Sequence, residues 1–85
     1  MARKLYEIAA DIRADYASKG KPVHPWAKPY VDAMATLSEM TDMYGLDSGD
    51  YCMRYALSNL SSWRGDKARE VKAEMREMLG LKPTR

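Results

Sequence analysis

Hydrophobic side chains recur at helical spacing along most of this chain, beginning with a stretch over residues 3–18. Side chains three and four positions apart share one face of a helix, so this stretch predicts an amphipathic helix. Its apolar positions are Leu5, Ile8, Ala9, Ile12 and Tyr16. Gly20 ends the pattern, and the two prolines that follow it predict a loop over residues 20–25.

The longest uninterrupted helical pattern starts between Pro25 and Pro29 and continues to Tyr44. Proline is tolerated in the first turn of a helix, and glycine commonly follows the last turn, as Gly45 does here. The apolar positions of this stretch are Tyr30, Ala33, Met34, Leu37, Met40 and Tyr44. The pattern therefore predicts a second helix that ends at a turn formed by residues 45–50.

Two further helical patterns follow that turn, on either side of a polar break at residues 61–65. The first covers residues 48–62, and the second ends at Gly80. Their apolar positions are Cys52, Tyr55, Ala56, Leu60 and Trp63, and then Ala68, Val71, Met75, Met78 and Leu79. Residues 48–79 form either one long helix kinked near Gly65 or two helices, since the spacing is compatible with both.

The patterns predict an all-α fold in a single domain, residues 1–85. Residues 1–24 supply an N-terminal helix and loop, and residues 25–80 supply a helical hairpin whose second arm is long and kinked. A chain this short buries only about 60–65% of its unfolded surface. Six Tyr, two Trp and seven Met are residue types favoured at contact surfaces, so we predict a compact homo-oligomer. A monomer with several exposed tyrosines is the alternative.

Charge is unevenly distributed although the net charge is only +2. Residues 51–85 carry eight basic and four acidic side chains, whereas residues 21–50 carry two and five. This excess is far smaller than that of a nucleic-acid-binding tail, but it suffices for a small phosphorylated ligand. The single cysteine, Cys52, cannot form an internal disulfide, and no apolar run is long enough to span a membrane. We therefore expect a cytoplasmic protein without a membrane partner.

The polar break at residues 61–65 is the first candidate site. It places the indole of Trp63 and the cation of Arg64 beside two serine hydroxyls, which suits a ligand that carries a flat base and a phosphate. Asn59 can read a base edge, and Ser61, Ser62 and Arg64 can donate to phosphate. Arg69 begins a basic stripe completed by Lys72 and Arg76. In the structural alternative, Trp63 packs over the kink and the stripe is an ordinary solvated face.

The second candidate site is the start of the second predicted helix. Lys28 and free backbone N–H groups can attract a phosphate there, while Trp26 or Tyr30 offers a stacking surface. Tyr16, at the end of the first helix, can close such a pocket from the other side. The structural alternative is a hydrophobic staple that anchors the loop against the helix.

Catalytic patterns are weak in this sequence. His24 is the only histidine, and neither it nor Cys52 lies in a pattern that would make a nucleophile or a metal site. No glycine-rich phosphate loop occurs either. We therefore expect a binding protein that is not an enzyme and that needs no metal or cofactor.

Four segments occur in the order found in a family of small bacteriophage proteins. They are PYVDAM at residues 29–34, YGLDSG at 44–49, YALSNLSSWRG at 55–65 and AREVKAE at 68–74. Together they resemble the phage anti-CBASS cyclic-nucleotide sponges, whose helical hairpin is shared with a sponge that counters Thoeris defence. The resemblance covers roughly residues 25–79.

The resemblance implies a homohexamer in the host bacterial cytosol that binds cyclic dinucleotides and cyclic trinucleotides without cleaving them. Immune effectors then never receive their signal. It also implies pockets in which a tyrosine stacks on a base, here Tyr16, and a lysine before the second helix, here Lys28, holds phosphate. The arginine near the helix break matches Arg64 or Arg69. The alternatives are a small DNA-binding module, which the interleaved glutamates disfavour, and an inhibitor that binds a host protein.

Overall fold

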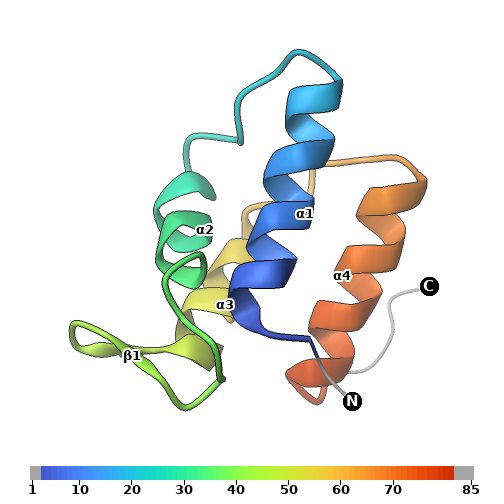
Figure 1. Cartoon of the computed structure of the whole chain (residues 1–85). Coiled ribbons are helices and arrows are strands. Elements are labelled where there is room, and N and C mark those ends of the chain that lie inside the picture. The colour runs from blue at the N-terminus through green and yellow to red at the C-terminus, as the bar shows by residue number, and fades with distance from the viewer. Residues whose placement is uncertain (1–2, 82–85) are drawn as a thin grey trace.

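The computed structural model describes residues 3–81, and the chain is mostly helical (Figure 1). The elements are α1 (Leu5–Ser18), α2 (Lys28–Met34), β1 (Met43–Tyr44), β2 (Asp47–Ser48), α3 (Gly49–Ser58) and α4 (Asp66–Met78). The two short strands pair antiparallel, with Met43 opposite Ser48 and Tyr44 opposite Asp47. In Figure 1, α1 and α4 lie side by side and run in opposite directions, while α2 packs against α3. The mostly helical class is confirmed, with a small strand pair that the sequence pattern did not predict.

In α1 and α4 the core is built from the apolar faces that the spacing predicts. The prediction is wrong for Tyr44 and Tyr55, which are 48% and 41% exposed, and in α3 Met53 is buried instead. Leu5, Ile8 and Ile12 of α1 are fully buried, as are Val71 and Met75 of α4. Burying one side chain of this size stabilises the fold by about 1.5–3 kcal/mol. The helical spacing of α1 and α4 thus identifies the faces on which both helices pack.

The predicted second helix is shorter than expected. The prediction of a helix to Tyr44 is wrong, because α2 ends at Met34 and turns and the strand pair follow. The carboxylate of Asp42 accepts backbone N–H bonds from Ser38 and Glu39, at 2.9 and 2.8 Å. Such local bonds compete with helical ones. The backbone carbonyls of residues 37 and 38 in turn accept the first two N–H groups of α1.

The polar break separates two helices in this structure, so the long kinked arm is replaced by α3 and α4. α3 ends at Ser58, and α4 begins at Asp66. Gly65, directly before α4, has a φ of +114°, a backbone conformation that favours glycine. Between the helices, Leu60 and Trp63 are buried and anchor the connection to the core. The connection is therefore a defined turn rather than a bend within one helix.

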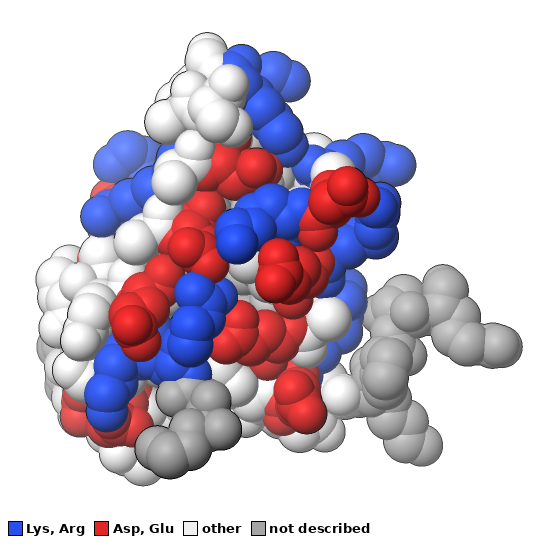
Figure 2. Space-filling model, turned by 45° about the vertical axis from the view of Figure 1, so that its right-hand side comes forward, with Lys and Arg blue, Asp and Glu red and all other residues white. Residues whose placement is uncertain are grey.

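Ion pairs join α1 to α4. Arg3 contacts the carboxylates of Asp11 and Glu74, at 2.6 and 2.7 Å, and Lys67 lies 3.6 Å from Asp11. The surface shown in Figure 2 accordingly has acidic and basic side chains interleaved rather than separated into blocks. The charges on this surface largely neutralise one another.

Replacing Gly49 with alanine should destabilise the fold by about 1–3 kcal/mol, since a well-packed site resists extra atoms. A Cβ at Gly49 would lie 2.7 Å from the carbonyl oxygen of Glu39 and 2.8 Å from Leu5 Cδ2. Urea unfolding of the two proteins measures the difference. Ala10→Ser, at an exposed position of α1, is the control and should change stability by less than about 0.5 kcal/mol. Equal stability of Gly49→Ala and wild type would mean that this contact relaxes freely.

Candidate functional site

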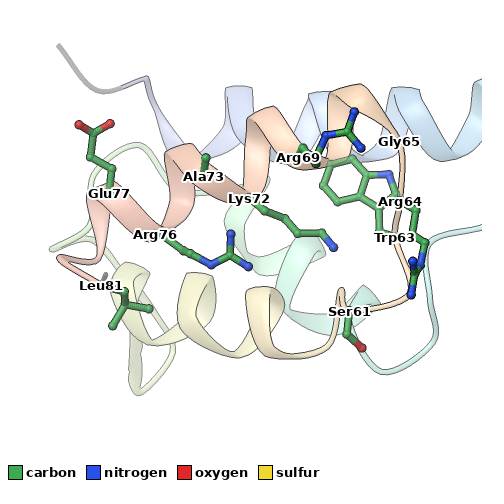
Figure 3. A pocket seen from close by; sticks show the side chains of 10 residues that line it. All are labelled: Ser61, Trp63, Arg64, Gly65, Arg69, Lys72, Ala73, Arg76, Glu77 and Leu81. Atoms are coloured by element: carbon green, nitrogen blue, oxygen red, sulfur yellow. The ribbon is translucent and has the colours of Figure 1, made fainter. Parts of the chain in front are cut away.

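An open groove of about 750 Å³ lies along α4 and the segment that precedes it (Figure 3). We call it the basic groove because four of its ten lining residues are Lys or Arg. The lining residues are Ser61, Trp63, Arg64, Gly65, Arg69, Lys72, Ala73, Arg76, Glu77 and Leu81. Its volume falls within the range of about 300–1,000 Å³ that is usual for small-molecule sites.

The periodicity of α4 brings its cations to the groove. Ala68, Val71 and Met75 face the core, so the neighbouring face carries the residues one position further along. Lys72 and Arg76 are one turn apart on that face, and Figure 3 shows both side chains extending from α4 toward α3. The same amphipathic pattern that buries α4 therefore lines the groove with charge.

The groove carries positive charge that its surroundings do not neutralise. Within residues 3–81, Arg64, Lys72 and Arg76 form no ion pair, whereas Arg69 is paired with Asp66. Burial lowers the pKa of Lys72, and repulsion from Arg76 and Arg64 lowers it further. Glu77 is the only acidic lining residue, and in Figure 3 its carboxylate points away from the Lys72 amine. An anion would relieve this repulsion.

Trp63 forms the apolar part of the groove wall and is firmly held. Its side chain is 2% exposed, and its Nε1–H donates to Asp15 Oδ2 at 2.7 Å. The Tyr16 ring stacks against it, with centroids 5.9 Å apart and planes 19° from parallel. Lys72 Nζ lies 6.0 Å from the centroid of the indole ring, at the limit of a cation–π contact. The structural alternative for Trp63, packing over the break, thus describes its position well.

The residues predicted around the polar break are only partly brought together. Arg64 and Arg69 line the groove, but Ser62 does not, and the hydroxyl on the wall belongs to Ser61. The side-chain amide of Asn59 donates to the backbone oxygen of Tyr55 at 2.9 Å. Asn59 is therefore occupied by its own helix and lies outside the groove.

Tyr16 occupies a different place from the one expected of a ligand-stacking ring. Its side chain is 7% exposed, and its ring is already stacked on Trp63. Burial raises the pKa of its hydroxyl, which has no hydrogen-bond partner among the described residues. In this arrangement Tyr16 supports the groove wall from behind and offers no free face to a base.

The second predicted cluster lies outside the basic groove. The Lys28 ammonium is paired with Asp32 at 2.8 Å, and Arg13 contacts the same carboxylate at 2.6 Å. Tyr30 stacks on Tyr55 with centroids 5.5 Å apart. Trp26 is 73% exposed and contacts the edge of His24, at 6.2 Å between centroids. Of this cluster, Trp26 presents the largest free aromatic surface.

Lys72 and Arg76 line the groove, although the sequence analysis did not choose them as ligand-binding residues. Their spacing from Arg69, at i+3 and i+7, did place all three in one stripe. An amphipathic face explains that stripe equally well, and only the path of residues 59–65 past α4 makes it one wall of a groove. The spacing of these cations was visible in the sequence, but only the fold shows that they line a groove.

Comparisons with protein-family models, with curated proteins and with solved structures found no match to the chain. The likeness to the phage sponges therefore stays a prediction from the sequence motifs. No helix within residues 3–81 is long and apolar enough to cross a membrane. The same residues contain no group of three or more His, Cys, Asp or Glu side chains placed to hold a metal ion.

Proposed function

We propose that this protein binds cyclic di- and trinucleotides and sequesters them without cleaving them, with their phosphates in the basic groove. The observation that carries the proposal is the set of cations in the groove, Arg64, Lys72 and Arg76, which form no ion pair within residues 3–81. Unpaired guanidinium and ammonium groups in a concave site are typical binding partners of phosphate. The sequence resemblance supplies the cyclic nature of the ligand.

The composition of the groove suits a ligand with both charged and flat parts. Cations lie beside the Trp63 wall and the apolar side chains of Ala73 and Leu81. Each charge-assisted hydrogen bond to phosphate contributes about 1.5–3 kcal/mol, so two phosphates held by the groove cations would supply most of the binding energy. Trp63 is only 2% exposed and is already stacked on Tyr16, so a base would gain little stacking from it.

We also propose that the protein acts as a homo-oligomer, a hexamer by the resemblance, in the bacterial cytosol during phage infection. Several large apolar side chains near the strand pair and on α3 are 40–97% exposed: Met43, Tyr44, Leu46, Tyr51 and Tyr55. Exposed apolar surface of this kind commonly marks protein contacts. An open groove would gain from a second protomer that covers the ligand. Multiple sites per assembly would suit a stoichiometric sponge.

A thermal-shift screen tests the proposal. Cyclic dinucleotides and trinucleotides are each added to the purified full chain, with AMP and duplex DNA as controls. Saturation at 100 to 1,000 times the dissociation constant should add about 2.7–4 kcal/mol of stability, which raises Tm by several degrees. Recovery of the intact ligand afterwards would support sequestration.

The outcomes separate the candidate functions. A shift with one cyclic nucleotide and not with AMP supports the sponge. A shift with duplex DNA alone, weakening steeply with salt, would instead indicate a nucleic-acid-binding module. No shift with any of these probes would refute the proposed ligand class and direct attention to the exposed aromatic side chains as a protein-binding surface.

A further inference from the structure

The C-terminal end of α1 is tied to the segment that forms one wall of the basic groove. Lys19 Nζ lies 2.9 Å from Asp15 Oδ2 and donates to the backbone carbonyl of Arg64 at 2.6 Å. The same Asp15 oxygen accepts the indole N–H of Trp63 at 2.7 Å. Asp15 of α1 and Lys19, directly after the helix, thus hold two consecutive residues of the wall, across separations of 48 and 45 positions in the sequence.

The Asp15 side of this contact is shielded from solvent, whereas the Lys19 side chain is 40% exposed. The Asp15 side chain is only 16% exposed, and the bonds from Lys19 and Trp63 hold the pKa of its carboxyl below the usual range. The Lys19 ammonium sits so close to the turn that a Cβ on Gly65 would lie 3.4 Å from it. Removing Asp15 leaves the part-buried indole N–H of Trp63 without its bond, which costs more than losing an exposed charge pair. The bond from Lys19 to the Arg64 carbonyl is exposed, so water replaces part of it when Lys19 is removed.

We infer that Asp15 and Lys19 are positioning residues that hold residues 61–65, and with them Arg64, in the geometry that the groove needs to receive an anion. This inference rests on the proposed function for its consequence in binding. Neither residue lines the groove, so neither contacts the ligand. Their contribution is to order the wall before the ligand arrives, which reduces the entropy lost on binding.

The position of Arg64 in the chain explains why such a hold is needed. Residues 59–65 lie between two helices, and Arg64 is flanked by Gly65, whose missing side chain leaves the backbone free to move. Lys72 and Arg76, by contrast, are held by α4 itself. Of the three groove cations without an ion pair, Arg64 is the one whose place depends on contacts from elsewhere.

Lys19→Met tests the inference, because it keeps most of the unbranched side chain but removes the ammonium. Amide exchange in the ligand-free full chain is followed by NMR at the Trp63 backbone N–H, which donates to the Leu60 carbonyl at 3.0 Å, and at the Trp63 indole N–H. Both should exchange about tenfold faster in the variant, as expected for local opening. The exposed indole of Trp26 should not change and serves as an internal reference.

The affinity for a cyclic dinucleotide, measured by calorimetry with cyclic di-AMP or whichever probe shifts the wild type, should fall about tenfold with Lys19→Met. Lys4→Met is the matched control, because Lys4 pairs with Glu39 away from the groove and should alter neither readout. Lys19→Arg keeps the cation and should restore both.

The outcomes distinguish the positioning role of Asp15 and Lys19 from the proposed binding of cyclic nucleotides. Unchanged exchange at Trp63 in Lys19→Met would overturn the positioning role. Faster exchange with unchanged affinity would show that ordering of the groove wall by Lys19 does not contribute to ligand binding. A wild type that binds no cyclic nucleotide would refute the proposed function, and the exchange measurement would still decide whether Asp15 and Lys19 order the wall.

Discussion

Replacing Lys72 and Arg76 together with glutamine should lower the affinity for the cyclic nucleotide by about 100-fold or more. Each side chain can make one charge-assisted bond to phosphate worth at least about 1.5 kcal/mol, and about 1.4 kcal/mol corresponds to a factor of ten. Both cations face the groove and form no ion pair within residues 3–81. Glutamine keeps the helix propensity and much of the size, so α4 should fold normally. Calorimetric titration measures the loss.

The matched control is Lys4→Gln with Arg13→Gln, which changes the net charge equally but away from the groove. Its affinity should stay within about twofold of the wild type when salt screens distant charges. Raising the salt concentration should weaken the wild type more than the Lys72/Arg76 variant. Equal losses in the two double variants would show that net charge, and not the groove, attracts the ligand.

Replacing Trp63 with alanine should lower the free energy of unfolding by about 3–5 kcal/mol, the range for deleting a large buried aromatic side chain. The indole is 2% exposed, stacks on Tyr16 and donates to Asp15. Since small domains are stable by only about 5–15 kcal/mol, this variant should lose a large share of its free energy of unfolding. Urea unfolding followed by circular dichroism measures the difference.

Trp63→Phe separates the contribution of ring packing from that of the hydrogen bond to Asp15, because it keeps a ring but loses the N–H donor. The free energy of unfolding should fall by less than in the alanine variant, and the part due to the lost bond is about 1.5–3 kcal/mol because Asp15 is charged. Trp26→Ala removes an indole that is 73% exposed and should change stability by less than about 0.5 kcal/mol. Similar costs at Trp63 and Trp26 would contradict the assignment of Trp63 to the core.

Local patterns predicted most of the helices because those helices bury one continuous face. The expected helix over residues 3–18 corresponds to α1, and the one after Gly65 corresponds to α4. The helix expected up to Tyr44 was wrong for one tertiary and one local reason. Residues 37 and 38 bond to the start of α1, and the Asp42 side chain bonds to the backbone of Ser38 and Glu39, so the apolar spacing of this segment does not continue as a helix.

For the candidate site too, the sequence revealed some properties and only the structure revealed the others. Residue types and spacing identified Arg64, Arg69 and the basic stripe, since charge is visible in a sequence. Burial is not visible there, so Tyr16 was expected to face a ligand although its ring packs on Trp63. Pairing is equally hidden: Lys28 and Arg69 each have an acidic partner, whereas Lys72 and Arg76 form no ion pair within residues 3–81.

The sequence by itself determined which faces of α1 and α4 enter the core, that the helical pattern is interrupted at residues 61–65, and how many cations follow that interruption. These properties depend on neighbours within a few positions, where helical geometry makes spacing equivalent to proximity. Only the tertiary structure decided that α1 reaches residues 61–65 through Asp15 and Lys19, and that Lys72 and Arg76 line a groove. Those contacts join residues far apart in the chain, so they exist only once the helices have packed.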